Sequence, residues 1–107
     1  MKTPLEILKA LSDRNRLRVV AALMHNTELC ACQLVELLGV SGATASRHME
    51  LLIRAGLVQS RKDGRWVHYR LHAAVAPQLI QWLETELTHS AEIQADVQKL
   101  KQITGCN

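Results

Sequence analysis

Residues 30–57, CACQLVELLGVSGATASRHMELLIRAGL, contain the pattern that decides the fold. The first half has an apolar helical face formed by Leu34, Leu37 and Leu38. The second half has another, formed by Ala45, Met49 and Leu52. Between them, Gly39 tolerates the positive φ of a helix end, and Ser41 suits the N-cap of the helix that follows. Two helices joined by so short a turn predict a helix-turn-helix motif over about residues 30–56.

The second of these helices offers polar side chains in its first turns. Small hydrogen-bonding and cationic groups at this position are typical of a helix that enters the major groove of DNA. We expect groove contacts from Thr44, Ser46, Arg47 and His48. Arg47 could bind a guanine edge or a phosphate, and His48 could face the core instead. We expect Ser41 mainly to cap the helix and, as a second role, to contact a DNA phosphate.

After Leu57 the apolar pattern alternates, as it does in strands. Residues 57–62 and 65–71 are strand candidates separated by Asp63-Gly64, a dipeptide typical of a two-residue hairpin turn. The register that this turn predicts pairs Val58 with Tyr69 and Ser60 with Val67. Three cations lie near the tip, Arg61, Lys62 and Arg65. A basic hairpin directly after a recognition helix predicts a wing, over about residues 57–71, that contacts DNA phosphates.

Charge and composition agree with a nucleic-acid partner. The net charge of the 107 residues is +3, and residues 41–72 hold six Lys or Arg against two acidic residues. A cationic segment within a small domain is the electrostatic footprint of nucleic-acid binding. No apolar run reaches ~18 residues, so we expect no membrane partner. The N-terminus lacks the pattern of a signal peptide, which predicts a cytoplasmic protein with reduced thiols.

The remaining segments predict helices and a dimer. Leu5, Leu8 and Leu11 line a helix that starts at Pro4, and Asp13 can cap the next helix. A single long helix fits about residues 74–103. Its apolar stripe exceeds what one small domain can cover, so we expect dimerisation through the first and last helices. The dimer residues expected are Leu5, Leu8, Leu79, Leu83 and Leu87.

The whole pattern predicts one mainly α domain of the α+β type spanning residues 1–107. It is a winged helix-turn-helix with about five helices and a two-stranded hairpin. As a dimer it would present two recognition helices to successive major-groove segments about 34–36 Å apart, so we expect an inverted-repeat operator in double-stranded DNA.

Three motifs, in this order and at this spacing, resemble the ArsR/SmtB family of metal-responsive repressors. Residues 28–34, ELCACQL, look like that family's ELCxCxL metal-binding box. Residues 46–52, SRHMELL, look like its recognition-helix signature, and residues 56–71 closely follow its wing. Within the family the chain looks most like the arsenite and antimonite sensors. The resemblance implies a homodimeric repressor with no constitutive cofactor, released from its operator by As(III) or Sb(III).

The resemblance has two departures. Val35 stands where the arsenite-sensor pattern has a third cysteine, which leaves the ligand set open. Residues 42–44 read Gly-Ala-Thr where the family often has Gln-Pro-Lys, so we expect this protein to read a different operator sequence.

The cysteines supply the expected inducer site. Trivalent arsenic favours thiolates, so Cys30 and Cys32 are the expected ligands. The third is Cys106, from the same subunit or the partner, or else a hydroxide or small thiol. Side chains two apart on a helix point about 200° away from each other. The two sulfurs can hold one small atom only if the helix begins after Cys32 or if its first turn unwinds. We therefore expect the metalloid to deform the start of this helix, which leads to the recognition helix.

Other signals fit the residues less well. A zinc site on the last helix would have His89 and Glu92 but lacks ligands at Ala76 and Gln78. Cadmium and lead sensors of the family recruit N-terminal cysteines, and none precedes Cys30. A thiol-redox or persulfide sensor stays open, although adjacent i, i+2 cysteines form a strained ring. CxC is not the CxxC redox motif and no phosphate-binding loop is present, so the sequence does not predict an enzyme.

Overall fold

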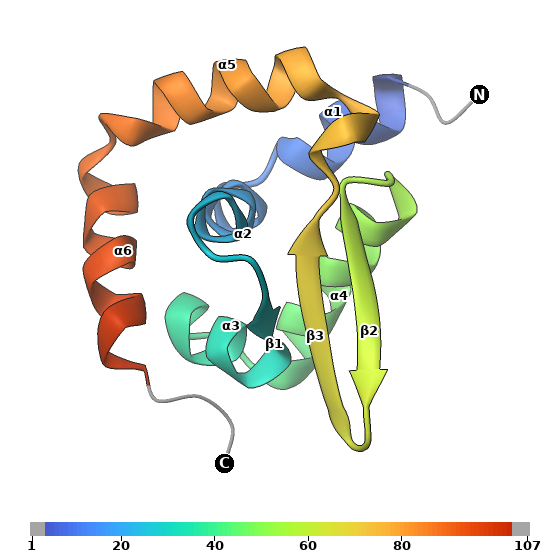
Figure 1. The fold of residues 1–107 in the computed structure, drawn as a ribbon, viewed down its shortest axis with the longest axis vertical. Coiled ribbons are helices and arrows are strands. Elements are labelled where there is room, and N and C mark those ends of the chain that lie inside the picture. Colours follow the sequence, from blue (N-terminus) through green and yellow to red (C-terminus); the bar gives the residue numbers. More distant parts are fainter. Residues whose placement is uncertain (1–3, 104–107) are drawn as a thin grey trace.

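The computed structural model describes residues 4–103, which form a winged helix-turn-helix domain (Figure 1). Its helices are α1 (Pro4–Leu11), α2 (Arg14–His25), α3 (Ala31–Leu38), α4 (Gly42–Arg54), α5 (Pro77–Thr88) and α6 (Ala91–Gln102), with a 3₁₀ turn, η1 (Ala73–Val75). Its strands are β1 (Leu29–Cys30), β2 (Val58–Asp63) and β3 (Trp66–Leu71). The predicted fold class is confirmed, with one helix and one strand more than expected. None of the helices in residues 4–103 is long and apolar enough to cross a membrane.

The core surrounds α2, which lies in the middle of the molecule (Figure 1). Leucines and valines fill it because the chain has no Phe. Its most deeply buried side chains are Val19, Val20, Leu34, Leu37, Leu52, Leu57 and Val58. The predicted inner face of the recognition helix, Ala45, Met49 and Leu52, is buried as expected.

The turn between α3 and α4 has the predicted caps. Gly39 has a φ of 67°, and its N–H donates to the carbonyl of Val35 at 2.9 Å. Ser41 Oγ accepts a hydrogen bond from the N–H of Thr44 at 3.1 Å. These two local contacts end one helix and begin the next, so they fix the direction in which α4 leaves the core.

The sheet differs from the prediction in register and in size. Val58 lies opposite Leu71 and Ser60 opposite Tyr69, so the predicted pairs were wrong by two residues. Asp63 pairs with Trp66, which makes Gly64-Arg65 the turn, and only Gly64 there has a positive φ. A third strand, β1, pairs with β3 through Leu29 opposite Tyr69 and Cys30 opposite His68. The order of the antiparallel sheet is β1-β3-β2.

The prediction of one helix over residues 74–103 is wrong. The helix is interrupted at His89 and Ser90, where α5 ends. Ser90 is the N-cap of α6, because its Oγ accepts a hydrogen bond from the N–H of Ile93. Figure 1 shows α5 across the top of the fold and α6 running down its side. The break lets the second half of the stripe pack against α2 and α3 of the same subunit.

A buried ion pair holds α6 in this position. Arg18 in α2 donates to both carboxylate oxygens of Asp96, at 2.8 and 3.0 Å. Arg18 and Lys99 also donate to the carbonyl of Leu37, at 3.1 and 3.0 Å. The hydrogen bonds that Arg18 donates to Asp96 raise the pKa of Arg18, against the opposing effect of burial. The last turn of α3, immediately before the recognition helix, is thus tied to α2 and α6.

We expect Asp96→Asn to lower the free energy of unfolding by about 2 kcal/mol, because it leaves the half-buried Arg18 without its counter-charge. Glu92→Gln is the matched control, since Glu92 pairs with an arginine, Arg14, whose side chain is 80% exposed. Urea unfolding of both variants measures the difference. Equal stability of the two variants would contradict an anchoring role for Asp96.

Candidate functional site

The recognition helix α4 presents the predicted polar residues on its outer side. Thr44, Ser46 and Arg47 are exposed. Arg47 has no hydrogen bond or ion pair within the described residues, so its guanidinium is available to a ligand. Ser41 is occupied as the N-cap, and its hydroxyl also donates to Thr44 Oγ1 at 3.0 Å. The first turns of α4 therefore offer hydrogen-bonding groups and a cation on one open surface.

His48 lies differently from its neighbours on α4. It is half-buried, and its Nδ1 is 3.1 Å from Nη1 of Arg16 in α2. Arg16 also donates from Nε to the carbonyl of Ala10, at the end of α1. The Arg16 side chain thus links α1, α2 and α4. This contact indicates that His48 helps to hold α4 in place rather than to contact the DNA groove.

The three predicted cations of the wing have different surroundings. Lys62 is exposed and has no ion pair within residues 4–103. The guanidinium of Arg65 lies 5.2 Å from the ring centroid of Trp66, a cation–π contact that leaves its charge accessible. Arg61 is bound by a carboxylate: its Nε and Nη2 donate to Glu28 at 2.8 and 2.7 Å. These hydrogen bonds lower the pKa of Glu28, against the opposing effect of desolvation.

Cys30 and Cys32 meet at the start of α3. Cys30 is the N-cap, with an extended backbone (φ −84°, ψ 161°), and its N–H donates to Oε1 of Gln33 at 2.8 Å. Only Cys32 lies within the helix, and the two sulfurs are 3.4 Å apart. The expectation that the helix must unwind to bring them together is therefore wrong, because the helix begins after Cys30.

This separation suits a small atom held by both sulfurs. An atom bonded to each at about 2.3 Å, the length of a metal–thiolate bond, would hold them at an angle of roughly 95°. Such an angle is closer to a trigonal pyramid than to the tetrahedron that zinc adopts. Among the described residues, no three His, Cys, Asp or Glu side chains cluster as a metal site. The third predicted ligand, Cys106, lies outside the described residues.

The cysteine pair lies next to the recognition helix. Cys30 is buried, whereas Cys32 is half-buried and lines a mostly apolar cavity of about 320 Å³. Ala45, Ser46 and Met49 of α4 line the same cavity. A ligand on Cys32 would therefore be close to the helix that carries the predicted DNA contacts.

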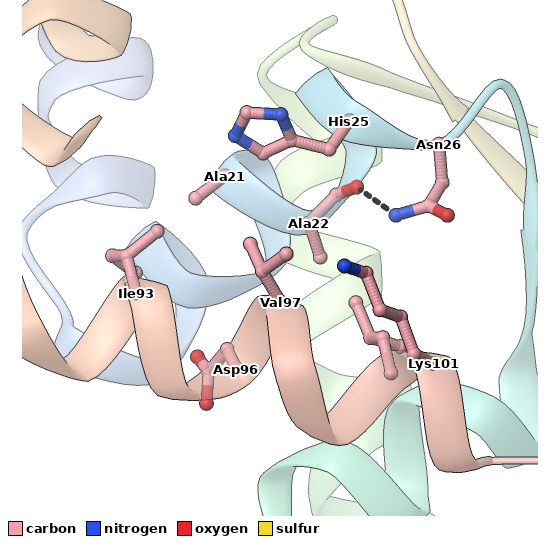
Figure 2. Close-up of a pocket in the computed structure, with 9 residues that line it drawn as sticks. Ala21, Ala22, His25, Asn26, Ile93, Asp96, Val97 and Lys101 are labelled. Carbon is pink, nitrogen blue, oxygen red and sulfur yellow. Dashed lines mark hydrogen bonds between the residues drawn. The ribbon is translucent and has the colours of Figure 1, made fainter.

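A second cavity, of about 150 Å³, lies between α2 and α6 and contains none of the cysteines (Figure 2). Its walls are mainly apolar, with Ala21, Ala22 and Val97 among them, and Asn26 closes one end by donating to the carbonyl of Ala22. The carboxylate of Asp96 is already bound by Arg18. This cavity offers no chemistry comparable to that of the two neighbouring cysteines.

Glu92, one of the two residues considered for a zinc site, is already bound by an arginine. Both carboxylate oxygens of Glu92 accept from Nε of Arg14, at 2.9 and 3.0 Å. This hydrogen bonding lowers the pKa of Glu92. His89 caps the end of α5, next to the break between α5 and α6.

The predicted dimer residues divide into two groups. Leu5 and Leu8 on α1 are 58% and 57% exposed. Leu83 is buried in its own subunit, and Leu79 and Leu87 pack partly against the same core. Trp82, which sequence analysis missed, is 58% exposed on α5. Its position one residue before the leucine stripe places it on the outer side of the helix.

Comparisons with known proteins agree with this geometry. The model of the bacterial regulatory protein, arsR family, matches residues 13–60. Over 106 residues the chain is 33% identical to the arsenic resistance transcriptional regulator ArsR2 of Pseudomonas putida, covering 98% of this chain and 92% of the relative. It is 48% identical over 61 residues to the cadmium resistance regulatory protein CadC of Listeria innocua, covering 57% of this chain and 51% of CadC.

The solved structure of HlyU from Vibrio cholerae is similar in fold, with a TM-score of 0.71 and 30% identity, covering 79% of this chain and 91% of HlyU. The chain spans about half to two-thirds of the length of several curated relatives, which include arsenic and cadmium resistance regulators. The match to ArsR2 extends over nearly all of both proteins. The chain therefore belongs to the ArsR family of bacterial transcriptional regulators.

Proposed function

We propose that this protein is a repressor that binds operator DNA as a homodimer and leaves it when trivalent arsenic or antimony binds Cys30 and Cys32. The observation that carries the proposal is the 3.4 Å separation of the two sulfurs at the start of α3. Two thiolates at that distance suit a soft, pyramidal centre. The full-length match to an arsenic resistance regulator supports the same inducer.

The position of the cysteine pair supports its coupling to DNA. The pair lies at the start of α3, with Cys30 just before the helix and Cys32 in its first turn, and α3 leads through Gly39 and Ser41 directly into α4. Chelation would fix Cys30 to Cys32, and so fix β1 to the first turn of α3. A ligand can release DNA only by the difference in its affinity for the two states, so this clamp must fit the DNA-free arrangement better.

Cadmium is the second candidate inducer, because the chain is 48% identical over 61 residues to the cadmium resistance regulator CadC. Cadmium would also bind thiolates, although it favours more ligands than two. A thiol-redox or persulfide signal would act on the same cysteines. The three signals separate in one experiment, since each is added independently.

We expect arsenite to release the protein from duplex DNA taken from upstream of its own gene, measured by fluorescence anisotropy under reducing conditions. Zinc, cadmium and a persulfide donor, each added alone, serve as comparisons. Cys30→Ser and Cys32→Ser should bind DNA but lose the arsenite response, because each removes one of the two close sulfurs. Cys106→Ser tests the third ligand. Release of the Cys30→Ser and Cys32→Ser variants by arsenite would refute the proposed site.

We expect Arg47→Ala to weaken DNA binding about tenfold, because it removes an unpaired cation from the outer side of α4. Arg14→Ala is the matched control, since Arg14 is exposed on α2 and paired with Glu92. The same anisotropy titration measures both. An equal effect of the two substitutions would argue that only net charge matters and that α4 does not read the DNA.

We expect Leu8→Asp to convert the dimer to monomers, measured by sedimentation equilibrium. The exposed residues Leu5 and Leu8 on α1 and Trp82 on α5 form the apolar surface that a second copy would bury. Ile53→Asp is the control, because Ile53 is an exposed apolar residue on α4. A Leu8→Asp protein that stays dimeric would contradict an interface through α1.

A further inference from the structure

An ion pair connects the segment that precedes α3, residues 28–30, to the wing. Glu28 stands two residues before Cys30, and it binds Arg61 on β2 through two hydrogen bonds. β3 lies between them: Cys30 and Arg61 are both in register with His68, on opposite sides of that strand. His68 Nδ1 lies 3.8 Å from a carboxylate oxygen of Glu28. Glu28, directly before β1, therefore contacts β2 on the other side of β3, the middle strand of the sheet. Figure 1 shows the three strands in this order.

The contact occupies the part of Arg61 that would bind DNA. A guanidinium presents its paired N–H groups to a carboxylate or to a phosphate in the same bidentate geometry, so the two ligands compete. The side chain of Arg61 is 55% exposed, and it borders an open groove of about 780 Å³ that is lined by the wing, by Glu28 and by Ile53 of α4. Among the described residues that line this groove, Glu28 is the one carboxylate, beside Arg61, Arg70 and two histidines.

We propose that Glu28 withholds Arg61 from DNA phosphates and does so most strongly when the cysteine pair holds its ligand. The second half of this proposal rests on the proposed metalloid switch. Cys30 is in the β-ladder and Glu28 is in the same short segment, so chelation of Cys30 fixes β1 and keeps Glu28 over Arg61. Without the ligand, the ion pair opens more easily, and a phosphate takes the place of the carboxylate. Ligand binding at the cysteines then changes the affinity of the wing for DNA without acting through α4.

The test is Glu28→Gln, measured against the same duplex DNA at several salt concentrations. The variant should bind DNA about threefold more tightly, because Arg61 no longer exchanges a carboxylate for a phosphate. The plot of log K against log salt should become steeper by about one, since no vacated carboxylate takes up a cation. Glu92→Gln makes the same charge change on α6 and should alter neither quantity. Unchanged or weaker DNA binding by Glu28→Gln would overturn the proposal.

A double-mutant cycle with Arg61→Gln separates competition from general repulsion. In the Arg61→Gln background, Glu28→Gln should have no effect on DNA affinity, because the residue through which it acts is gone. The same threefold gain in that background would mean that Glu28 only repels DNA, and the proposal would fail. Thermal unfolding of each variant verifies that it folds.

Adding arsenite to the same titrations tests whether the cysteine ligand strengthens the hold of Glu28 on Arg61. Arsenite should weaken DNA binding by a factor about three smaller in Glu28→Gln than in the wild type, while ultraviolet absorbance of the arsenic–thiolate bond shows unchanged arsenite binding. An undiminished arsenite effect in Glu28→Gln would overturn the coupling. If arsenite fails to release the wild type, the proposed inducer is wrong, and the salt titrations and the cycle still decide whether Glu28 competes for Arg61.

Discussion

The pairing of two residues, Leu29 and Cys30, with β3 determines the chemistry of this molecule. It holds Cys30 in an extended conformation, and as a result α3 begins one residue later. The two sulfurs consequently lie 3.4 Å apart instead of on opposite sides of a helix. The same pairing brings Glu28 within reach of the wing. One short strand thus brings the sulfurs of Cys30 and Cys32 together and connects this segment to the wing.

The recognition helix is held from several directions at once. Gly39 and Ser41 fix its start, Arg16 contacts His48 in its middle, and Met49 and Leu52 anchor it in the core. Arg18 and Lys99 fix the preceding helix through the carbonyl of Leu37. We therefore expect this helix to move as a unit with its supports, and we propose that a ligand at the start of α3 would act on α4 through them.

Sequence reasoning succeeded where the signal was local. The turn at Gly39 and Ser41 and the inner face of α4 both depend on residues a few positions apart. It failed where distant residues decide the structure. β1 is two residues long and its partner strand is almost forty residues away, so no local periodicity reveals it. The break at Ser90 resembles an ordinary polar interruption until the packing of α6 on Arg18 is known. Glu28 and Arg61 are 33 residues apart, and only the sheet joins them.

The central claim is that the cysteine ligand and DNA favour different arrangements of the same protein. Linkage then requires DNA to weaken arsenite binding by the same factor by which arsenite weakens DNA binding. The most direct measurement is the arsenite affinity of the protein with and without saturating duplex DNA, followed by arsenic–thiolate absorbance. The account predicts weaker arsenite binding in the presence of DNA, by a factor equal to the loss of DNA affinity. Equal arsenite affinity in the two samples would contradict it.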